Sequence, residues 1–427
     1  MKNFFLKLLR LLGLPLRMFL VWIAFVLVLW MSRGIGAGYP ALALAILAAV
    51  ALWWRWSRPR SPRARVLHGL AMALAVAPLA YVMVPLAPSI LQPLSADASV
   101  QLWSTGPSRS VAVYHFPADA AVDRRLALVF AHGGPGGYIR EFDRDFFASF
   151  AKAGFEVVLY DQFGAGRSAL GDTAGYTHEN NIDDLAAVIA RVNKPVMLVG
   201  QSYGATLVTS ALARPEISKR VSYVVLTEPG KIPGAGFDSD KTMTAKTTTA
   251  PDATLMPTAA IAGKLAAPRA LLAAFLPAGH GFVSQEEVIN HYTPDVQRAL
   301  VSNSFCKGSN PLLDAYQPLR FNLLANAAIS GGARAAPRPN LQHLAAPVMM
   351  LLGQCSYIPR GRAMEYFGVY KLARTHWIEG VGHVVWGNPT GQQRTRDAIL
   401  RFVDNVPGAL PNEPTQATAT AFARSGR

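Results

Sequence analysis

The run of five residues from Gly200 to Gly204 constrains the fold of this chain more than any other part of its sequence. It reads Gly-Gln-Ser-Tyr-Gly and lies between an apolar segment typical of a buried strand, 195–199, and a segment compatible with a helix, 205–212. A sharp strand-to-helix turn needs small residues on both sides because the backbone folds back on itself, and it exposes the serine hydroxyl above the sheet. The sequence therefore predicts a strand, a tight turn with Ser202 at its tip, and a helix.

Apolar segments alternate with helical patterns on both sides of this turn, which is typical of a parallel sheet covered on both faces. An antiparallel entry hairpin is expected first, at 100–103 and 110–115. The expected strands of the main sheet are 126–131, 156–160, 196–199, 221–226, 348–352 and 376–378. The expected helices are 182–192, 205–213 and 394–403. The predicted fold class is α/β, with a doubly wound, mostly parallel sheet.

A second glycine-rich loop, His-Gly-Gly-Pro-Gly-Gly at 132–137, directly follows one of the expected strands. Glycines let the backbone approach a reacting carbonyl closely, so the peptide N–H of Gly134 is expected to face a developing oxyanion. The N–H of Tyr203, next to the serine, is the expected second donor. The alternative for this loop is a glycine-rich turn with no function.

The base is predicted to be His383, which ends the segment Glu-Gly-Val-Gly-His after the last expected strand. This position gives the chain order serine, acid, histidine. His376 is the nearby rival, and it lies within the expected strand. The remaining histidines that we interpret as structural are His132, His178, His280 and His291.

Three motifs together resemble the proline iminopeptidase group of the α/β-hydrolases. They are HGGPGG at 132–137, DQFGAGRS at 161–168 and GQSYGA at 200–205, and the resemblance covers about 125 to 405. It implies an α/β-hydrolase fold and a structural role, in the loop after the fourth strand, for Asp161, Gly164, Gly166 and Arg167. The aminopeptidases of this group hold a substrate ammonium with acidic residues in and near the cap, and no such motif matches here. The acidic residues available in this region are Glu286, Glu287, Asp295 and Asp314.

The position of the acid departs from the pattern of this group. The resemblance implies an aspartate where Ser356 stands, and a serine hydroxyl cannot offset the charge of an imidazolium. Glu228 closely follows the neighbouring strand and keeps the chain order, so we predict that it supplies the acid. The alternatives are that Glu228 only caps a turn with Pro229 and Gly230, that Asp238 or Asp240 is the acid, or that there is none.

The insertion between the strands at 221–226 and 348–352 is expected to be a helical cap. Ser284 to Glu287 has the pattern of a capping box, and 256–275 has apolar residues at helical spacing. The expected domains are a membrane anchor at 1–95, a hydrolase core at 96–230 and 345–405, a cap at 231–344 and a disordered tail at 406–427.

Three apolar runs, 12–31, 36–54 and 66–91, predict three transmembrane helices before this domain. No acidic residue precedes Asp97. Basic residues gather at the N-terminus and at 55–65, so positive-inside logic places both in the cytoplasm and everything beyond about residue 95 on the far side. In a bacterium this means an inner-membrane protein with a periplasmic catalytic domain, and an exported Cys306–Cys355 pair is either oxidised or left as two buried thiols.

Much of the net charge of +15 flanks these apolar runs, so nucleic-acid binding is not expected. We expect a serine hydrolase that cleaves a peptide, amide or ester bond of a small-molecule or peptide substrate through an acyl-enzyme, without a cofactor or metal. Dehalogenase and epoxide hydrolase chemistry would require an aspartate in place of Ser202. The alternative is a catalytically impaired binding protein of the same fold.

The predicted topology is tested with a reporter fused after Asn405. Because charge alternates across the three apolar runs, a phosphatase reporter that folds only after export is expected to be active, and a fluorescent reporter that folds only in the cytoplasm is expected to be dark. The opposite pattern would mean that the number of spans is even.

Overall fold

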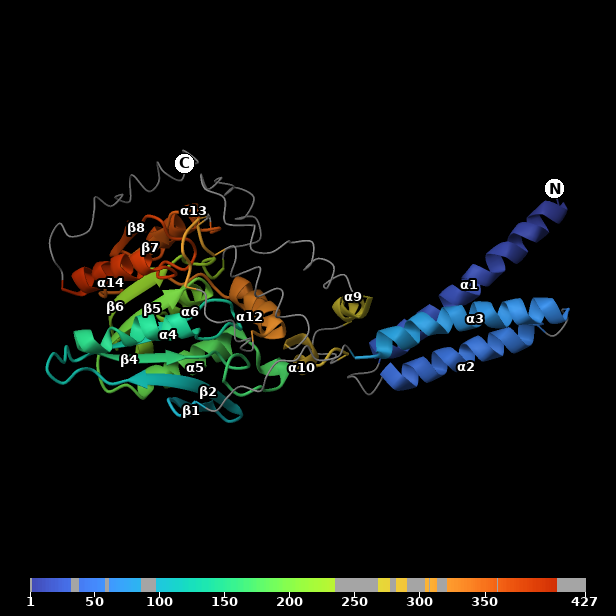
Figure 1. Cartoon of the computed structure of the whole chain (residues 1–427), viewed down its shortest axis with the longest axis horizontal. Helices are drawn as coiled ribbons and strands as arrows, with labels where there is room; N and C mark the ends of the chain where they lie inside the picture. Colours follow the sequence, from blue (N-terminus) through green and yellow to red (C-terminus); the bar gives the residue numbers. More distant parts are fainter. Residues whose placement is uncertain are drawn as a thin grey trace. The chain divides into compact units, whose positions relative to one another are not determined.

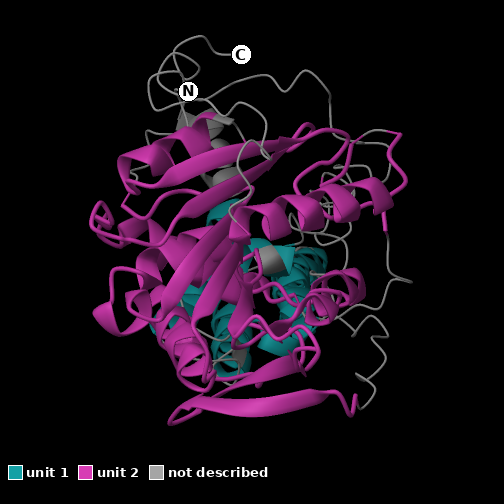
Figure 2. Cartoon of the chain, turned by 90° about the vertical axis from the view of Figure 1, so that its left-hand side faces the viewer, with its two compact units in different colours: residues 1–90, 259–292 teal, residues 91–258, 293–427 magenta. Residues whose placement is uncertain are grey.

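The computed structural model describes residues 2–31, 38–57, 61–85, 97–234, 268–276, 282–289, 304–306, 308–312, 321–358 and 360–404. The chain divides into two compact units, which Figure 2 shows in different colours. Unit 1 comprises Met1–Ile90 and Ala259–Tyr292, and unit 2 comprises Leu91–Thr258 and Thr293–Arg427.

Unit 2 is built on an eight-stranded sheet with the order β1-β2-β4-β3-β5-β6-β7-β8 (Figure 1). Its strands are β1 (Val100–Gly106), β2 (Arg109–Phe116), β3 (Leu126–Ala131), β4 (Phe155–Tyr160), β5 (Val196–Gln201), β6 (Val221–Thr227), β7 (Val348–Gly353) and β8 (Ala373–Ile378). The pairs β1–β2 and β2–β4 are antiparallel, and all other neighbours are parallel. The predicted hairpin and parallel strands are confirmed, with β8 beginning at Ala373 rather than at 376.

Helices cover both faces of this sheet. One face packs against α4 (Glu141–Ala148) and α14 (Pro389–Val403), and the other against α5 (His178–Ala190), α6 (Tyr203–Ala211) and α13 (Arg360–Glu365). Short α7 (Pro215–Ser218) precedes β6, and α12 (Leu323–Ala335) precedes β7. Successive side chains of a strand serve opposite faces: Val129 of β3 faces the α5 side and Phe130 faces the α4 side. Burial on both faces therefore explains the continuous apolar runs.

Helix ends differ from the sequence expectation where polar caps decide them. The predicted helix at 394–403 begins at Pro389, because Asn388 caps it by accepting the Gly391 N–H at 2.7 Å and proline suits a first turn. Thr177 likewise caps α5, which therefore begins at His178 rather than at 182. Helix α4 was not predicted, although Phe142 and Phe146 lie on its buried face at helical spacing.

Unit 1 contains three helices, α1 (Lys2–Met31), α2 (Gly38–Ser57) and α3 (Pro62–Met83), together with α9 (Pro268–Phe275) and α10 (Gln285–Glu287). Apolar residues at four-residue spacing pack inside, as at Val21, Phe25 and Leu29. Within the described residues, one helix, Arg65–Met83, is long and apolar enough to cross a membrane, whereas the apolar helices Met18–Met31 and Tyr39–Arg55 are shorter. By length and composition alone, one of the three predicted spans meets this criterion, and the three transmembrane helices stay a prediction.

The insertion is described only in part. Ser284 caps α10 by accepting the Glu287 N–H at 3.1 Å, as predicted. The helix expected at 256–275 is seen from Pro268 onward, and 235–267 lie outside the described residues. The predicted tail at 406–427 and the residues His280, His291, Asp238, Asp240, Asp295 and Asp314 also lie outside them. Residues 259–292 group with unit 1, and the rest of the insertion groups with unit 2.

Candidate active site

Ser202 lies at the predicted turn between β5 and α6, with a left-handed backbone φ of 55°. The turn is tight on both sides. A Cβ on Gly200 would lie 2.6 Å from the carbonyl oxygen of Gly204, and a Cβ on Gly204 would lie 1.9 Å from that of Ala131. Both positions therefore require glycine, which explains the spacing in the sequence.

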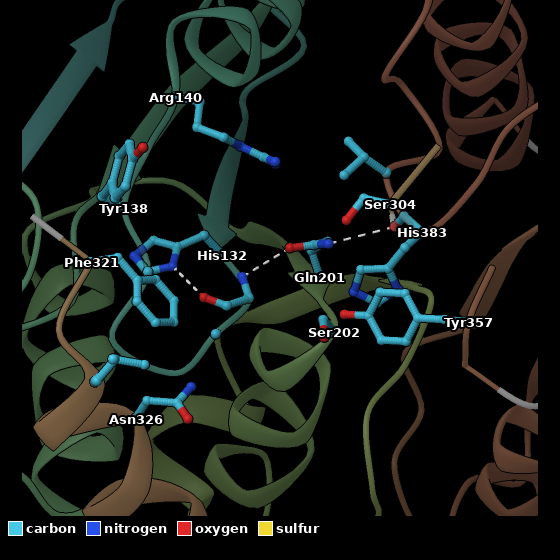
Figure 3. A pocket seen from close by; sticks show the side chains of 15 residues that line it. His132, Tyr138, Arg140, Gln201, Ser202, Ser304, Phe321, Asn326, Tyr357 and His383 are labelled. Carbon is cyan, nitrogen blue, oxygen red and sulfur yellow. Dashed lines mark hydrogen bonds between the residues drawn. The ribbon is translucent and has the colours of Figure 1, made fainter. Parts of the chain in front are cut away.

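A cavity of about 390 Å³ lies over this turn and brings the predicted residues together (Figure 3). Ser202, His383 and Gly134 all line it. The other described residues along its wall are His132, Gly133, Gly137, Tyr138, Arg140, Gln201, Ser304, Phe321, Leu323, Asn326, Tyr357 and Val384. The predicted nucleophile, the predicted base and one predicted oxyanion donor, from three distant segments, thus line one cavity in unit 2.

His132 fixes the orientation of the glycine loop. Its Nε2 accepts the backbone N–H of Gln162 at 3.0 Å, so its proton must be on Nδ1, which donates to the Gly133 carbonyl at 2.8 Å. The C=O and N–H of a trans peptide point in opposite directions, so the Gly134 N–H points away from His132. Burial lowers the pKa of His132 to about 4, which keeps this tautomer neutral.

Gln201 joins the three segments of the site. Its Oε1 accepts the Gly133 N–H at 2.9 Å, and its Nε2 donates to the backbone carbonyl of His383 at 3.5 Å (Figure 3). A Cβ on Gly133 would lie 2.9 Å from the Cβ of Ser202. The glycine loop therefore approaches the serine as closely as the backbone allows.

The side chain of Tyr203 anchors the first turn of α6. Its hydroxyl accepts an N–H of Asn181 at 3.1 Å and lies 2.9 Å from Nδ1 of His178, whose Nε2 lies 2.8 Å from the hydroxyl of Ser210. Burial lowers the pKa of His178 to about 4. The predicted structural role of His178 agrees with these contacts, and the anchored ring holds the Tyr203 N–H at the positive end of the helix.

His383 follows β8 and is 4% exposed. Burial, and after it the positive charge of Arg140, lowers its pKa to about 3. Its ring lies 4.3 Å from the ring of Tyr357, measured between centroids. Within the part of the chain that the structure describes, Nδ1 of His383 is buried without a hydrogen-bond partner. Its rival His376 lies in β8 as expected.

Glu228 lies where the sequence places it, at the end of β6 beside the end of β7. Its backbone N–H donates to the Leu351 carbonyl at 2.9 Å, and its carboxylate accepts the N–H of Gly353. It is 2% exposed and has a φ of 46°. Loss of solvent around the hydroxyl, and after it the Glu228 charge, raises the pKa of Tyr357 to about 12. Glu228 therefore lies near the ring that contacts His383 but does not hydrogen-bond to Nδ1 in this conformation.

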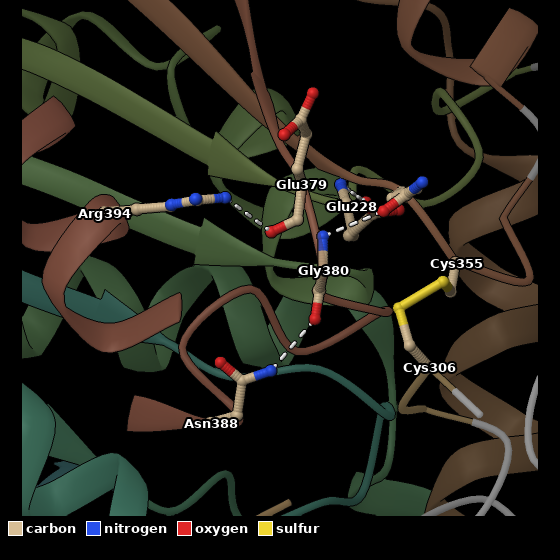
Figure 4. Close-up of a disulfide and its surroundings, with 9 residues drawn as sticks. Glu228, Cys306, Cys355, Glu379, Gly380, Asn388 and Arg394 are labelled. Carbon is tan, nitrogen blue, oxygen red and sulfur yellow. Dashed lines mark hydrogen bonds between the residues drawn. A yellow bond between two sulfur atoms is a disulfide. The ribbon is translucent and has the colours of Figure 1, made fainter. Parts of the chain in front are cut away.

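A disulfide between Cys306 and Cys355 ties the insertion to the loop after β7 (Figure 4). The sequence left this pair open between a disulfide and two thiols. Ser356, next to it, is 3% exposed, and its hydroxyl accepts the N–H of Ile358 at 3.1 Å. This serine thus stabilises a local turn at the position where the family pattern has an acid.

Asp161 holds the loop after β4 against the glycine loop, as the resemblance implies. Its carboxylate accepts the N–H groups of Ile139 at 2.6 Å and Arg167 at 2.8 Å. Burial raises its pKa to about 7. Gly164 and Gly166 both have positive φ values, 82° and 54°. These residues have a structural role and do not line the cavity.

Sequence reasoning missed four residues that shape the site: Gln201, Arg140, Phe321 and Asn326. Gln201 lies inside the serine motif, and its position next to Ser202 could have predicted that it belongs to the site. Asn326 donates to the Pro135 carbonyl at 2.8 Å, a contact across 191 residues that no local pattern reveals. Among the described residues, no group of three His, Cys, Asp or Glu side chains could hold a metal ion.

Comparisons with known proteins agree with this architecture. Residues 128–392 match the model of the alpha/beta hydrolase family. A proline iminopeptidase of Saccharolobus solfataricus is 38% identical over 86 residues, which are 19% of this chain and 26% of that protein. One of Thermoplasma volcanium is 33% identical over 92 residues, 20% of this chain and 30% of that protein. The chain thus matches less than a third of the length of either relative, and over these segments the predicted similarity is confirmed.

Similar folds occur among solved structures. A thermophilic esterase from Thermogutta terrifontis has a TM-score of 0.49 at 16% identity, covering 72% of this chain and 97% of its own. Proline iminopeptidase from Mycobacterium smegmatis has a TM-score of 0.45 at 16% identity, covering 72% of this chain and 98% of its own.

The lowered pKa of His383 predicts how the reactivity of Ser202 depends on pH. The imidazole accepts a proton only when neutral, so reaction of Ser202 with a fluorophosphonate should slow as the pH falls through the pKa of His383. Because that pKa is lowered from 6.5 to about 3, labelling should remain close to maximal at mildly acidic pH. A labelling midpoint at or above the ordinary histidine pKa would contradict the burial of this ring.

Proposed function

Since the chain belongs to the alpha/beta hydrolase family, we propose that it is a serine hydrolase that cleaves a peptide, amide or ester bond through an acyl-enzyme on Ser202. One observation carries the proposal: Ser202, at a left-handed φ, shares one cavity with His383 and Gly134. A strained turn that projects a hydroxyl into a cavity beside a neutral imidazole is suited to nucleophilic catalysis.

In the first half of the reaction, His383 takes the proton of the Ser202 hydroxyl while Oγ attacks the substrate carbonyl carbon. The N–H groups of Gly134 and Tyr203 stabilise the oxyanion of the tetrahedral intermediate. His383 then gives its proton to the leaving amine or alcohol as the carbonyl forms again, which leaves an ester on Ser202.

In the second half, a water molecule gives a proton to His383 and attacks the ester carbon. The same two N–H groups stabilise the second oxyanion. Ser202 leaves and recovers its proton from His383, and the carboxylic acid product departs. Glu228, at the neighbouring strand end, is proposed as the acid that offsets the imidazolium charge after a side-chain rotation toward Nδ1.

The substrate class follows in outline from the family and its similar members. A small molecule or a peptide fits a cavity of about 390 Å³. Two similar proteins are named proline iminopeptidases, which favours amide bonds, and a similar fold is named an esterase. Glu287 is one of the acidic residues considered for binding a substrate ammonium. Its carboxylate instead pairs with Arg269 at 2.7 Å within unit 1, which argues against that role.

We further propose that α1, α2 and α3 all cross a membrane and place the catalytic unit outside the cytoplasm, in the periplasm of a bacterium. Large apolar side chains face outward around these helices, with Phe19, Leu47 and Leu74 each more than 60% exposed. Such a surface is costly in water and favourable in a bilayer. The Cys306–Cys355 disulfide favours an oxidising compartment.

A catalytically impaired binding protein is the second candidate. It is favoured by Ser356 at the acid position and by the unpartnered Nδ1 of His383 among the described residues. An imidazole without an acid is a poorer base, and the cavity would then serve to hold a ligand. Covalent labelling separates the two functions.

The nucleophile is tested with a fluorophosphonate probe on the full chain. Wild type is expected to be labelled and Ser202→Ala is not, because the probe reacts with an activated serine. Ser304→Ala is the matched control, since Ser304 lines the same cavity, and this variant should retain labelling. Labelling that survives Ser202→Ala, or an unlabelled wild type, would remove Ser202 as nucleophile.

The acid is tested with Glu228→Gln. The amide oxygen still accepts the Gly353 N–H, so the fold should be retained while the negative charge is lost. Turnover is expected to fall by roughly 10⁴-fold, the cost where a triad acid was changed to its amide elsewhere. Glu379→Gln is the control: Glu379 is exposed and directly follows β8, and the turnover of this variant should be close to that of wild type. A loss of only a few-fold in Glu228→Gln would exclude Glu228, and Ser356→Asp would become the informative variant.

A further inference from the structure

The cavity contains a permanent positive charge that the hydrolase mechanism does not use. Arg140 lines it together with Ser202 and His383, and its side chain extends toward the cavity in Figure 3. Among the described residues along the wall there is no aspartate or glutamate. Arg140 is therefore the only permanently charged side chain among the described residues that line the cavity.

Arg140 is held by a buried carboxylate behind it. Asp143 accepts the backbone N–H of Arg140 at 3.0 Å, its Nε at 2.6 Å and its Nη2 at 2.9 Å, and also the Nε1–H of Trp386 at 2.8 Å. The side chain of Asp143 is 1% exposed and that of Arg140 is 18% exposed. Asp143 thus takes the Nε and Nη2 edge of the guanidinium and turns the Nη1 end away from itself.

This arrangement fixes the guanidinium before any substrate binds. A planar guanidinium recognises carboxylates with charge-assisted hydrogen bonds, and one whose rotamer is already held loses little entropy on binding. A substrate ammonium in the same cavity would meet a like charge and, among the described wall residues, no carboxylate. A site that binds an amino terminus needs a negative charge, whereas the charged side chain in this cavity is positive.

Resting on the proposed hydrolase function, we propose that this cavity selects substrates that carry a carboxylate near the scissile bond, with Arg140 as the residue that recognises it. The charge of Arg140 also acts on the base, since it is the second cause, after burial, of the lowered pKa of His383. A bound anion offsets that charge. The substrate then helps His383 to hold a proton during the reaction.

The test uses two pairs of chromogenic esters hydrolysed by the full chain. In one pair, the acyl chain of one ester ends in a carboxylate and that of the other ends in the corresponding methyl ester. In the second pair, the leaving group carries the carboxylate or its methyl ester. Wild type is expected to prefer the carboxylate in at least one pair by about tenfold in kcat/KM. Arg140→Gln should abolish that preference while still hydrolysing the neutral ester at the wild-type rate. Arg140→Lys should keep part of the preference.

Arg144→Gln is the matched control, because Arg144 lies in α4, the helix that Arg140 directly precedes, and does not line the cavity. It should leave the preference unchanged. Equal rates for both members of each pair in wild type would overturn the proposal. An equal loss on both members in Arg140→Gln would also overturn it, because Arg140 would then only neutralise Asp143. If no ester is hydrolysed and the fluorophosphonate does not label Ser202, the hydrolase function itself fails, and this proposal with it.

Discussion

The contact between the first turn of α6 and the end of β3 is the constraint on which the site depends. A Cβ on Gly204 would lie 1.9 Å from the Ala131 carbonyl oxygen, so helix and strand meet backbone to backbone. This approach forces Ser202 to the left-handed φ of 55° and places it beside the glycine loop, which begins one residue after Ala131. The proposed nucleophile and the proposed oxyanion donors are therefore adjacent because of main-chain packing.

Buried polar side chains then give the flexible glycine loop one conformation. His132 and Gln201 bind opposite ends of the Gly133 residue, through its carbonyl and its N–H. Asp161 binds the N–H of Ile139, just beyond the loop. Hydrogen bonds of this kind are costly to leave unmade in a low-dielectric interior, so they fix the backbone of the proposed oxyanion loop before substrate arrives. The freedom of glycine is used for close approach and is then removed by these neighbours.

The parts predictable from sequence were those encoded locally. The strands of the main sheet followed from apolar runs. The two glycine motifs predicted the tight turn at Ser202 and the close approach of the loop at 132–137, because steric need and spacing coincide there. Contacts between distant segments were not predictable. The Cys306–Cys355 pair spans 49 residues, and the bond from Trp386 to Asp143 joins α4 to the His383 loop. The partner of His383 depends on side-chain rotamers, which no motif encodes.

Two features of the site affect the cost of protonating His383: the serine at position 356 and the guanidinium of Arg140 in the cavity. The Ser356 hydroxyl accepts the N–H of Ile358, and among the described residues Nδ1 of His383 has no hydrogen-bond partner. Ser356 therefore does not bind Nδ1 here, and Arg140 disfavours a positive charge on His383. Both effects make the imidazolium of the proposed mechanism more costly than in a site with an aspartate at this position. Two negative charges can offset that cost: Glu228 at the end of β6, and a substrate carboxylate on Arg140. A site of this kind gains most in rate from a substrate that brings its own charge, so selectivity and catalysis would depend on the same electrostatic interaction.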